Sequence, residues 1–493
     1  MFLLKSTVAL VELGTTLNRK IIMPELPEVE TVKNVLLPIV KNRTILSVEV
    51  FRKTIVNGLD KEFISFFRNE TFLDISRIGK FLIIHFTNDK VLISHLRMEG
   101  KYIELLENEE NTKYARVVFH LDNGHKLCYD DSRSFGRMIM SHENDYLKEK
   151  EIAKLGPEPF EVDDVSNLLK QSKKISLPIK SALLTQTLIT GLGNIYVDEV
   201  LFASKVHPLT PTKLISKKEW ETLIKESKRI LKEAIAAGGS TIKSYHPGKD
   251  ISGEFQNKLL AYGRNGQKCV SCHALMRFIK VNGRGTTFCP RCQIKRGAPL
   301  RIALVGKIAS GKSTVLEEFK KVDALTLSSD QIVHELYGKS TIQELVSKRL
   351  KLKRTDDFVN DLRSHIANHS KDLERLERIV HPLVAKEIEK EFKASKSSLL
   401  VAEVPLLFKA KMQNMFDIII GLDIDEDKQL ERLQIRDQEK SAFLKRINDE
   451  NNLFEEHRDE IDFIVNNNDN VSSLQKEIKR LINTILDRLN PLL

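Results

Sequence analysis

The sequence predicts a multidomain protein, α+β in its first part and α/β in its last. We expect a β-sandwich, a helical domain and a small metal-binding finger, followed by a domain with a parallel sheet. Short β-rich runs separated by turn residues fill residues 45–119, and four cysteines form two Cys-x2-Cys pairs within residues 269–292. An apolar strand at residues 300–305 leads directly into Gly-x4-Gly-Lys-Ser, beginning at Gly306. A chain of 493 residues has room for about three domains.

Positive charge is concentrated in one part of the chain. The net charge of +10 divides into +12 for residues 1–300 (46 Lys and Arg against 34 Asp and Glu) and −2 for residues 301–493 (32 against 34). Residues 201–300 alone hold 19 basic and 6 acidic residues, which indicates a polyanionic partner; a solvated basic face is the alternative. No stretch approaches 18 uninterrupted apolar residues, so we expect no membrane span and a cytoplasmic protein.

The β-rich part is preceded by Met-Pro-Glu-Leu-Pro-Glu-Val-Glu-Thr at residues 23–31. If translation starts at Met23 and the methionine is removed, Pro24 carries a free secondary amine with a pKa of roughly 8. Such an amine is a nucleophile that can attack a sugar C1′ and form an iminium adduct. Glu25 and Glu28 stand close enough in sequence to manage protons around it. An ordinary proline-capped, acidic helix start is the alternative interpretation.

The part between the sandwich and residue 300 combines helices with a metal-ligand pattern. After a linker at residues 155–159 the sequence turns helical. Cys269-x2-Cys272-x16-Cys289-x2-Cys292 has the spacing of a tetrahedral thiolate site, and four cysteines without an open position predict structural zinc, one ion per chain. Residues 281–288 between the cysteine pairs read as a β-hairpin with Arg284 near its tip.

These stretches, from Met23 to about Gly297, resemble the bacterial formamidopyrimidine-DNA glycosylases. That family has an N-terminal proline nucleophile, a helix-two-turn-helix domain and a zinc finger. The resemblance implies excision of oxidised purines, 8-oxoguanine and formamidopyrimidines, from double-stranded DNA, followed by β,δ-elimination. It gives catalytic roles to Pro24, Glu25, Lys80 and Arg284. It gives DNA contacts to Met98, which would fill the gap left by the everted base, and to Tyr114, Arg133, Phe135, Lys180 and Asn194. Tyr114 stands where the family usually has histidine.

Residues 1–22 conflict with that chemistry, because a proline inside a chain has no amine to offer. We interpret residues 1–22 as a mis-assigned start or a removable leader. The alternative is a real extension that leaves a catalytically silent DNA-binding zinc module. The N-terminal residue of the isolated protein discriminates between the two.

The Gly-x4-Gly-Lys-Ser loop predicts a phosphate-binding site. Its backbone N–H groups would wrap the phosphates of ATP, Lys312 would reach the β- and γ-oxygens, and Ser313 would hold Mg²⁺. The residues assigned to ATP are Gly306, Ala309, Ser310, Gly311, Lys312, Ser313, Thr314, Arg432 and Arg436, the last two set one turn apart to clamp phosphates.

From Leu300 to about Leu486 the sequence resembles dephospho-CoA kinase, through this loop, Ser328-Ser329-Asp330, the strand at residues 399–408 and the arginine helix. The resemblance implies transfer of the γ-phosphate to the 3′-hydroxyl of dephospho-CoA, with Asp330 orienting or deprotonating that hydroxyl. The loop departs from the family by having Lys307 and Ala309 where glycine is common.

The predicted domains are a leader (1–22), the sandwich (23–150), the helical DNA-binding domain (151–262), the zinc finger (263–298) and the kinase (299–493). We expect the glycosylase part to be monomeric. A nucleotide-sensing regulator is the alternative for the last domain; nucleotide-dependent DNA affinity without CoA formation would support it.

Overall fold

The computed structural model describes residues 23–240, 254–352, 357–369, 371–434 and 451–489. The chain divides into two compact units, Met1–Ala153 with Glu233–Gln256, and Lys154–Lys232 with Asn257–Leu493. Most of the helical region groups with the finger and the kinase in the second unit. Within the described ranges no helix has the length and apolarity needed to cross a bilayer.

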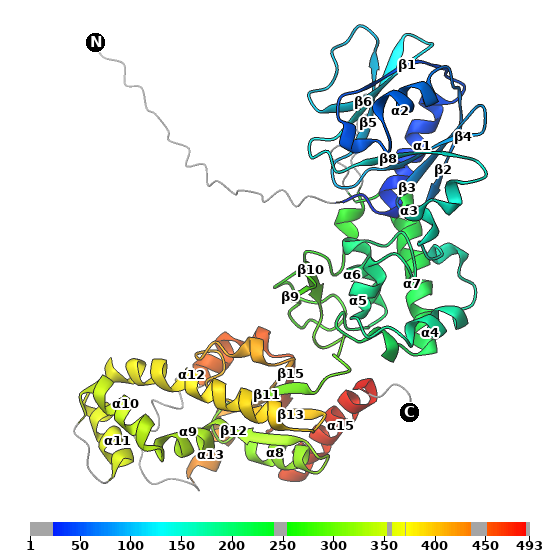
Figure 1. The fold of residues 1–493 in the computed structure, drawn as a ribbon. Coiled ribbons are helices and arrows are strands. Elements are labelled where there is room, and N and C mark those ends of the chain that lie inside the picture. The colour runs from blue at the N-terminus through cyan, green and yellow to red at the C-terminus, as the bar shows by residue number, and fades with distance from the viewer. Residues whose placement is uncertain (1–22, 241–253, 353–356, 370, 435–450, 490–493) are drawn as a thin grey trace, which may run out of the picture. The chain divides into compact units, whose positions relative to one another are not determined.

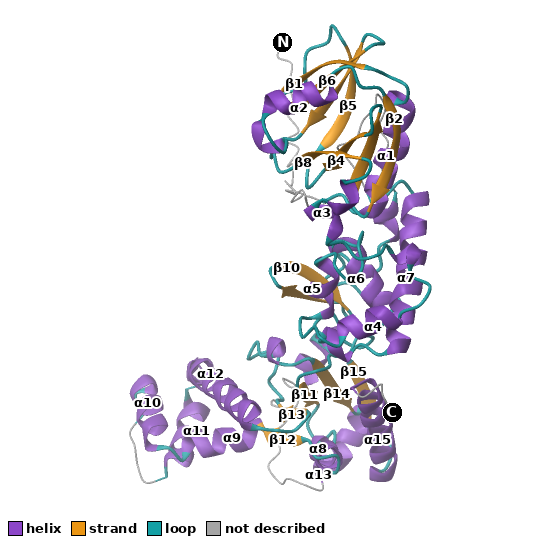
Figure 2. Cartoon of the chain, turned by 45° about the vertical axis from the view of Figure 1, so that its right-hand side comes forward, coloured by secondary structure: helices purple, strands orange, loops and turns teal. Residues whose placement is uncertain are grey.

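The first unit is the predicted β-sandwich, built from two antiparallel four-stranded sheets with the orders β1-β6-β7-β5 and β2-β3-β4-β8 (Figures 1 and 2). Its strands continue past the β-rich runs of residues 45–119 and end at residue 142. The elements are α1 (Leu26–Val40), β1 (Ile45–Val50), α2 (Asp60–Phe67), β2 (Phe72–Ile78), β3 (Phe81–Phe86), β4 (Lys90–His95), β5 (Lys101–Leu106), β6 (Ala115–Leu121), β7 (His125–Asp130) and β8 (Arg137–His142), with α3 (Lys150–Ala153) after them.

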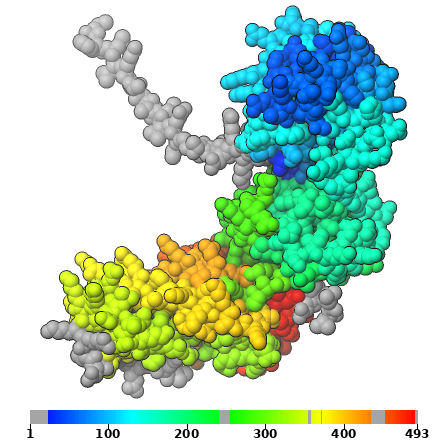
Figure 3. All heavy atoms as spheres, viewed as in Figure 1, coloured from blue at the N-terminus to red at the C-terminus, as the bar shows by residue number. Residues whose placement is uncertain are grey.

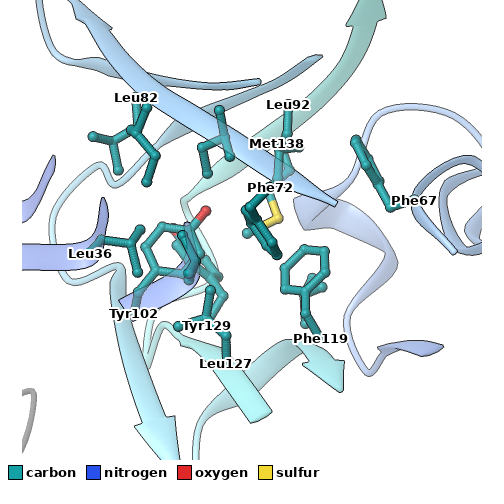
Figure 4. Packing of buried hydrophobic residues seen from close by; sticks show 14 of the residues in the cluster. Leu36, Phe67, Phe72, Leu82, Leu92, Tyr102, Phe119, Leu127, Tyr129 and Met138 are labelled. Atoms are coloured by element: carbon teal, nitrogen blue, oxygen red, sulfur yellow. The ribbon is translucent and has the colours of Figure 1, made fainter. Parts of the chain in front are cut away.

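Aromatic side chains fill the space between the two sheets (Figure 4). Phe72 and Phe86 lie with ring centroids 4.6 Å apart, and Phe67 lies 5.0 Å from Phe86. Tyr102 belongs to the same buried cluster, with its ring centroid 5.1 Å from that of Tyr129, and it donates to Ser94 Oγ over 2.7 Å. Most residues of β3, β4 and β7 are buried, so these strands carry much of the core of the first unit.

The second unit begins with helices and continues into the finger. The helices are α4 (Ser166–Ser172), α5 (Ile179–Leu184), α6 (Asn194–Ala203) and α7 (Lys217–Ala236), of which the last extends into the first unit. Trp220, the single tryptophan of the chain, is fully buried on α7 and donates to Ser172 Oγ over 3.2 Å. The finger hairpin pairs β9 (Arg277–Val281) with β10 (Arg284–Phe288) around an Asn282-Gly283 turn. Both turn residues have positive φ, as a two-residue hairpin turn requires.

The last part is a parallel five-stranded sheet with the order β12-β13-β11-β14-β15, as predicted for a P-loop domain. Its elements are β11 (Leu300–Gly306), α8 (Lys312–Lys320), β12 (Leu325–Ser328), α9 (Ser329–Tyr337), α10 (Ser340–Leu350), α11 (Phe358–Asn368), α12 (Lys371–Ala394), β13 (Leu399–Glu403), β14 (Ile418–Asp423), α13 (Glu426–Gln434), β15 (Phe463–Asn466) and α15 (Val471–Leu489). The helices α10, α11 and α12 form the yellow lobe of this domain in Figure 3.

Candidate active sites

The N-terminus of α1 is held by a buried glutamate. Glu28 accepts hydrogen bonds from Glu25 N (2.9 Å), Ser240 N (2.8 Å) and Ser240 Oγ (3.0 Å), and is 1 % exposed. Gly239 has φ +81°, and a Cβ there would come within 2.9 Å of Glu28 Oε1. Glu28 therefore positions the start of the helix. Glu25 is also buried, and Pro24 beside it is half-buried and bonded to Met23.

Lys80 lies in the turn between β2 and β3, directly after Gly79, and is largely buried. The preceding strand is tied to α1 because Arg77 Nε donates to Glu30 Oε2 over 2.7 Å. Burial would raise the pKa of Glu30, but hydrogen bonds from Lys33 and Arg77 lower it below its usual range. Arg77 on β2 is therefore held by Glu30, and Lys80 follows it in the turn at the same edge of the sandwich.

Three of the residues predicted to contact DNA lie on two neighbouring loops of the sandwich. Arg133 Nη1 lies 3.7 Å from Met98 Sδ, and Arg133 Nε lies 3.2 Å from a carboxylate oxygen of Glu99. Phe135, on the same loop as Arg133, is 52 % exposed. The Asp131 carboxylate fixes this loop, because it accepts hydrogen bonds from Arg133 N (3.0 Å) and Gly136 N (2.8 Å). An exposed aromatic ring beside a methionine and an arginine is suited to stacking and to base edges.

Tyr114 is half exposed, with Lys113 Nζ 5.3 Å from its ring centroid. Its carbonyl accepts Asp131 N over 3.0 Å, so it borders the Arg133 loop. The structure therefore brings Met98, Tyr114, Arg133 and Phe135 together in one region of the first unit.

Lys180 and Asn194, both in the second unit, are placed differently. Lys180 is 0 % exposed; its Nζ donates to Asp198 Oδ1 (2.6 Å) and to Gly285 O in the finger (3.1 Å). Burial raises the pKa of Asp198 to about 6, although Lys180 acts against this rise. In this arrangement Lys180 joins α5, α6 and β10, and the predicted phosphate contact stays a prediction. Asn194 is the first residue of α6, and within the described residues its buried Oδ1 has no hydrogen-bond partner.

The four cysteines meet as the spacing predicts. Their Sγ atoms all lie within 4.8 Å of one another, with 3.9 Å between Cys269 and Cys292 and 3.4 Å between Cys272 and Cys289. A tetrahedral zinc with Zn–S bonds of about 2.3 Å has sulfur–sulfur edges of about 3.8 Å, so the set fits zinc. Four thiolates leave no open position, which makes the site structural. The metal would fix the hairpin that presents Arg284, which is exposed at the start of β10.

The phosphate-binding loop connects β11 to α8. Gly306 and Gly311 have positive φ, and so does Ala309, at 59°. Three carbonyls of the loop are bound by side chains: Gln429 donates to Ile308 O (2.9 Å), Arg432 to Ala309 O (3.4 Å), and Asn467 to Ser310 O (2.8 Å). Since the carbonyls are held outward, the loop is shaped to turn its N–H groups toward an anion.

Lys312 and the arginine helix, α13, also lie at this loop. Lys312 Nζ donates to Gly306 O and Lys307 O, both over 3.0 Å. Ser313 is exposed and Thr314 half-buried at the start of α8. Arg432 also donates to Asn467 O over 3.0 Å, which places it beside the loop, whereas Arg436 lies outside the described residues.

Sequence reasoning missed an ionic network beneath the loop. Lys307 Nζ lies 2.8 Å from Asp423 and 2.9 Å from Glu455, and Arg458 Nη1 lies 2.6 Å and 3.2 Å from the same two carboxylates. Phe454 lies under both cations, 5.8 Å from each. Burial would lower the pKa of Lys307, but the two carboxylates raise it. The signal available in the sequence was Lys307 itself, at a position where glycine is common.

Asp330 is exposed on the first turn of α9 and lines a cavity of 220 Å³. The apolar wall of the cavity includes Val380 and Leu406, and its polar wall includes Glu377 and His381. Burial lowers the pKa of His381. His381 and Glu377 are further candidate residues of this site, and the cavity suits a ligand with a long uncharged part.

These features define two classes of protein in one chain. The sandwich with its clamped N-terminus, the helices and the four-cysteine hairpin define a zinc-finger DNA glycosylase, and the P-loop on a parallel sheet defines a P-loop kinase. Family models match in the same order: the formamidopyrimidine-DNA glycosylase N-terminal domain at residues 23–138, its H2TH domain at 155–246, the zinc finger found in FPG and IleRS at 266–294, and dephospho-CoA kinase at 300–473.

The chain belongs to the formamidopyrimidine-DNA glycosylase family and carries a dephospho-CoA kinase domain after it. It is 46 % identical over 274 residues to the formamidopyrimidine-DNA glycosylase of Shouchella clausii, which covers 55 % of this chain and 99 % of that protein. The Ligilactobacillus salivarius protein of the same name is 46 % identical over 277 residues, with 55 % and 99 % covered.

Solved structures agree. A complex between a variant of Lactococcus lactis FPG and a DNA containing Fapy-dG has a TM-score of 0.53 at 39 % identity, covering 55 % of this chain and 100 % of that one. A complex of Lactococcus lactis Fpg with abasic-site DNA has a TM-score of 0.51 at 38 % identity, covering 55 % and 99 %. These matches confirm the sandwich, the helical domain and the zinc finger predicted from the sequence, and the strand order of the last part confirms the predicted parallel sheet.

Proposed function

We propose that the chain is bifunctional, a DNA glycosylase and AP lyase for oxidised purines joined to a dephospho-CoA kinase. The glycosylase assignment is supported above all by the nearly complete match to glycosylase relatives, whose N-terminal family model starts at Met23 and so places Pro24 second. The buried Glu28 that holds the backbone at Glu25 supports it further, because it fixes the residue next to the nucleophile.

In the proposed glycosylase mechanism the Pro24 nitrogen attacks C1′ and the bond from C1′ to the base breaks. The sugar ring opens to an iminium as the nitrogen loses its proton, with Glu25 placed to handle protons. Removal of a C2′ proton then breaks the C3′–O bond, and a second elimination breaks the C5′–O bond. Lys80 and Arg284 would hold the phosphates that depart. Arg133 and Phe135 would fill the duplex opposite the lesion, with Arg133 hydrogen-bonded to the orphaned cytosine and Phe135 stacked beside it.

This mechanism requires Pro24 to be N-terminal in the active enzyme. We would compare the protein expressed from Met1 with one expressed from Met23, determine each N-terminal residue by mass spectrometry, and trap adducts with borohydride on an 8-oxoguanine duplex. An adduct only in preparations that begin at Pro24 supports the proposal. An adduct formed by protein with an intact Met1 terminus would assign the nucleophile to another residue.

For the kinase we propose transfer of the γ-phosphate of MgATP to the ribose 3′-hydroxyl of dephospho-CoA. Asp330 would accept or orient the hydroxyl proton, Lys312 and the loop amides would hold the ATP phosphates, and Ser313 would hold Mg²⁺. The observation that supports this assignment best is the position of Asp330 at the rim of the 220 Å³ cavity.

ADP and CoA formation by the full chain, measured with ATP and dephospho-CoA, tests the kinase. Lys312→Ala should abolish CoA formation and leave borohydride trapping unchanged, whereas Pro24→Ala should do the reverse. ATP binding without any CoA formation by the wild-type chain would instead support a nucleotide-sensing role.

A further inference from the structure

The zinc finger and the kinase are separated by very little sequence. The finger match ends at residue 294 and the kinase match begins at residue 300. Both belong to the same compact unit. Ile294, at the end of the finger, is 5 % exposed and lies in the hydrophobic cluster of the kinase with Leu300, Ile418 and Phe463. The apolar core of the kinase therefore includes a residue of the finger.

Arg277, the first residue of hairpin strand β9, reaches into the kinase. Its Nη2 forms an ion pair with Asp462 Oδ2, and its Nη1 donates to Phe416 O (3.3 Å) and Asp417 O (3.0 Å). Asp462 has only 2 % of its side chain exposed, and the same Oδ2 accepts Ile419 N over 2.8 Å. A carboxylate buried this completely is costly unless a cation accompanies it, so Asp462 indicates a site built for Arg277.

Three other contacts between the finger and the kinase also place the positive charge on the finger. Lys295 Nζ binds both oxygens of Asp417, at 2.9 Å and 3.2 Å, and Lys268 lies 3.0 Å from Asp459. The Arg291 guanidinium lies 5.1 Å from the centroid of Phe463. In each of these contacts the finger supplies the cation and the kinase supplies the acid or the ring. When every ion pair between two domains has its basic residue on the same side, the two surfaces are complementary in charge. This is typical of a specific interface and is not expected of two domains joined only by a linker.

We propose that the kinase domain carries a docking surface for the back of the zinc finger, formed by Asp417, Asp459, Asp462 and Phe463. The bound partner is the finger of the same chain, which enters through Arg277, Lys295, Lys268 and Arg291. Docking fixes the base of the β9–β10 hairpin, whose other end presents Arg284. The finger and the kinase are thereby joined at this point, and the kinase supports a DNA-binding element of the glycosylase.

Zero-length carbodiimide cross-linking of the full chain tests the docking directly, because the reagent joins only amines and carboxylates already in contact. Mass spectrometry should recover Lys295–Asp417 and Lys268–Asp459. Lys409–Glu377, at 2.5 Å within the kinase, is the internal control. Recovery of the control pair without either finger–kinase pair would overturn the proposal, whatever the catalytic activities.

A matched pair of variants tests the role of the buried ion pair. Arg277→Met should lower the yield of both finger–kinase cross-links about tenfold, because Asp462 loses its cation. Arg375→Met, which removes an exposed ion pair with Asp372 on α12, should leave them unchanged. If Arg277→Met folds and keeps wild-type cross-link yields, Arg277 does not anchor the finger and the docking surface is wrongly assigned.

Discussion

Replacing Lys180 by methionine removes a cation from the interior of the helical domain. In the structure Lys180 is 0 % exposed and its partner Asp198 is almost as deeply buried; Asp198 also accepts Thr287 N from the finger over 3.1 Å. Methionine fills nearly the same volume, so the main effect is electrostatic. The substitution leaves a buried carboxylate without its ion-pair partner and leaves Gly285 O without the ammonium donor.

Breaking a fully buried ion pair on one side costs about 3–5 kcal/mol. The cost should depend on pH, because an unpaired Asp198 can take up a proton. Its pKa in the folded variant lies further above the unfolded value than in the wild type, so stability falls as the pH rises between the two values. We therefore expect a smaller loss in free energy of unfolding at pH 5 than at pH 8.

Trp220 reports on unfolding of the second unit, because it is the single tryptophan of the chain and is buried in the unit that contains Lys180. Urea unfolding followed by its fluorescence should show Lys180→Met shifted to lower urea. Asp198→Asn and the double variant complete a thermodynamic cycle. The double variant should be more stable than the sum of the single losses predicts, by about 2 kcal/mol or more, because no buried charge then lacks a partner.

Two results would refute this reasoning. A shift below about 1 kcal/mol for Lys180→Met would mean that the pair contributes no more than a surface ion pair. Weaker DNA binding with unchanged unfolding would instead support the phosphate contact that the sequence suggests for Lys180.

Four further outcomes are expected. Lys307→Met should weaken ATP binding about tenfold in titration calorimetry because the phosphate-binding loop loses its ionic support, whereas Lys320→Met, at an exposed pair, should not. Ala309→Gly should raise the kinase unfolding free energy by about 0.5–1 kcal/mol, since alanine at φ 59° is strained; a lowered midpoint would contradict this. Burial lowers the pKa of His207 to about 3, so stability should be lost as the pH falls from about 6.5 toward 3, by up to roughly 3–5 kcal/mol, and His207→Asn should flatten this pH dependence. Cys289→Ser, or a strong chelator, should release the one zinc per chain and abolish DNA binding through the finger; unchanged binding without metal would show that zinc does not hold the hairpin.

The sites that could be predicted from the sequence are those formed by residues that lie close together along the chain. The two Cys-x2-Cys pairs and the glycine-rich loop depend on short spacings, so zinc and phosphate chemistry followed directly. The partners of Lys180 and Lys307 could not be predicted in this way, because Asp198, Gly285 and Asp423 lie 18 to 116 residues away. The clamp on Glu28 depends on Ser240, 212 residues later, and only the folded chain brings them together.

The strand order of the kinase sheet has a consequence for synthesis of the protein. β11 is the central strand, yet its two neighbours begin at Leu399 and Ile418, and the second lies 118 residues after Leu300. At about 5–20 residues per second the ribosome needs roughly 6–24 s after Leu300 to reach β14, the second of the two strands that pair with β11. Throughout that interval the completed zinc finger is followed by the apolar strand β11, whose neighbouring strands have not yet been synthesised. We therefore expect nascent chains that stall between β11 and β14 to be the aggregation-prone form of this protein.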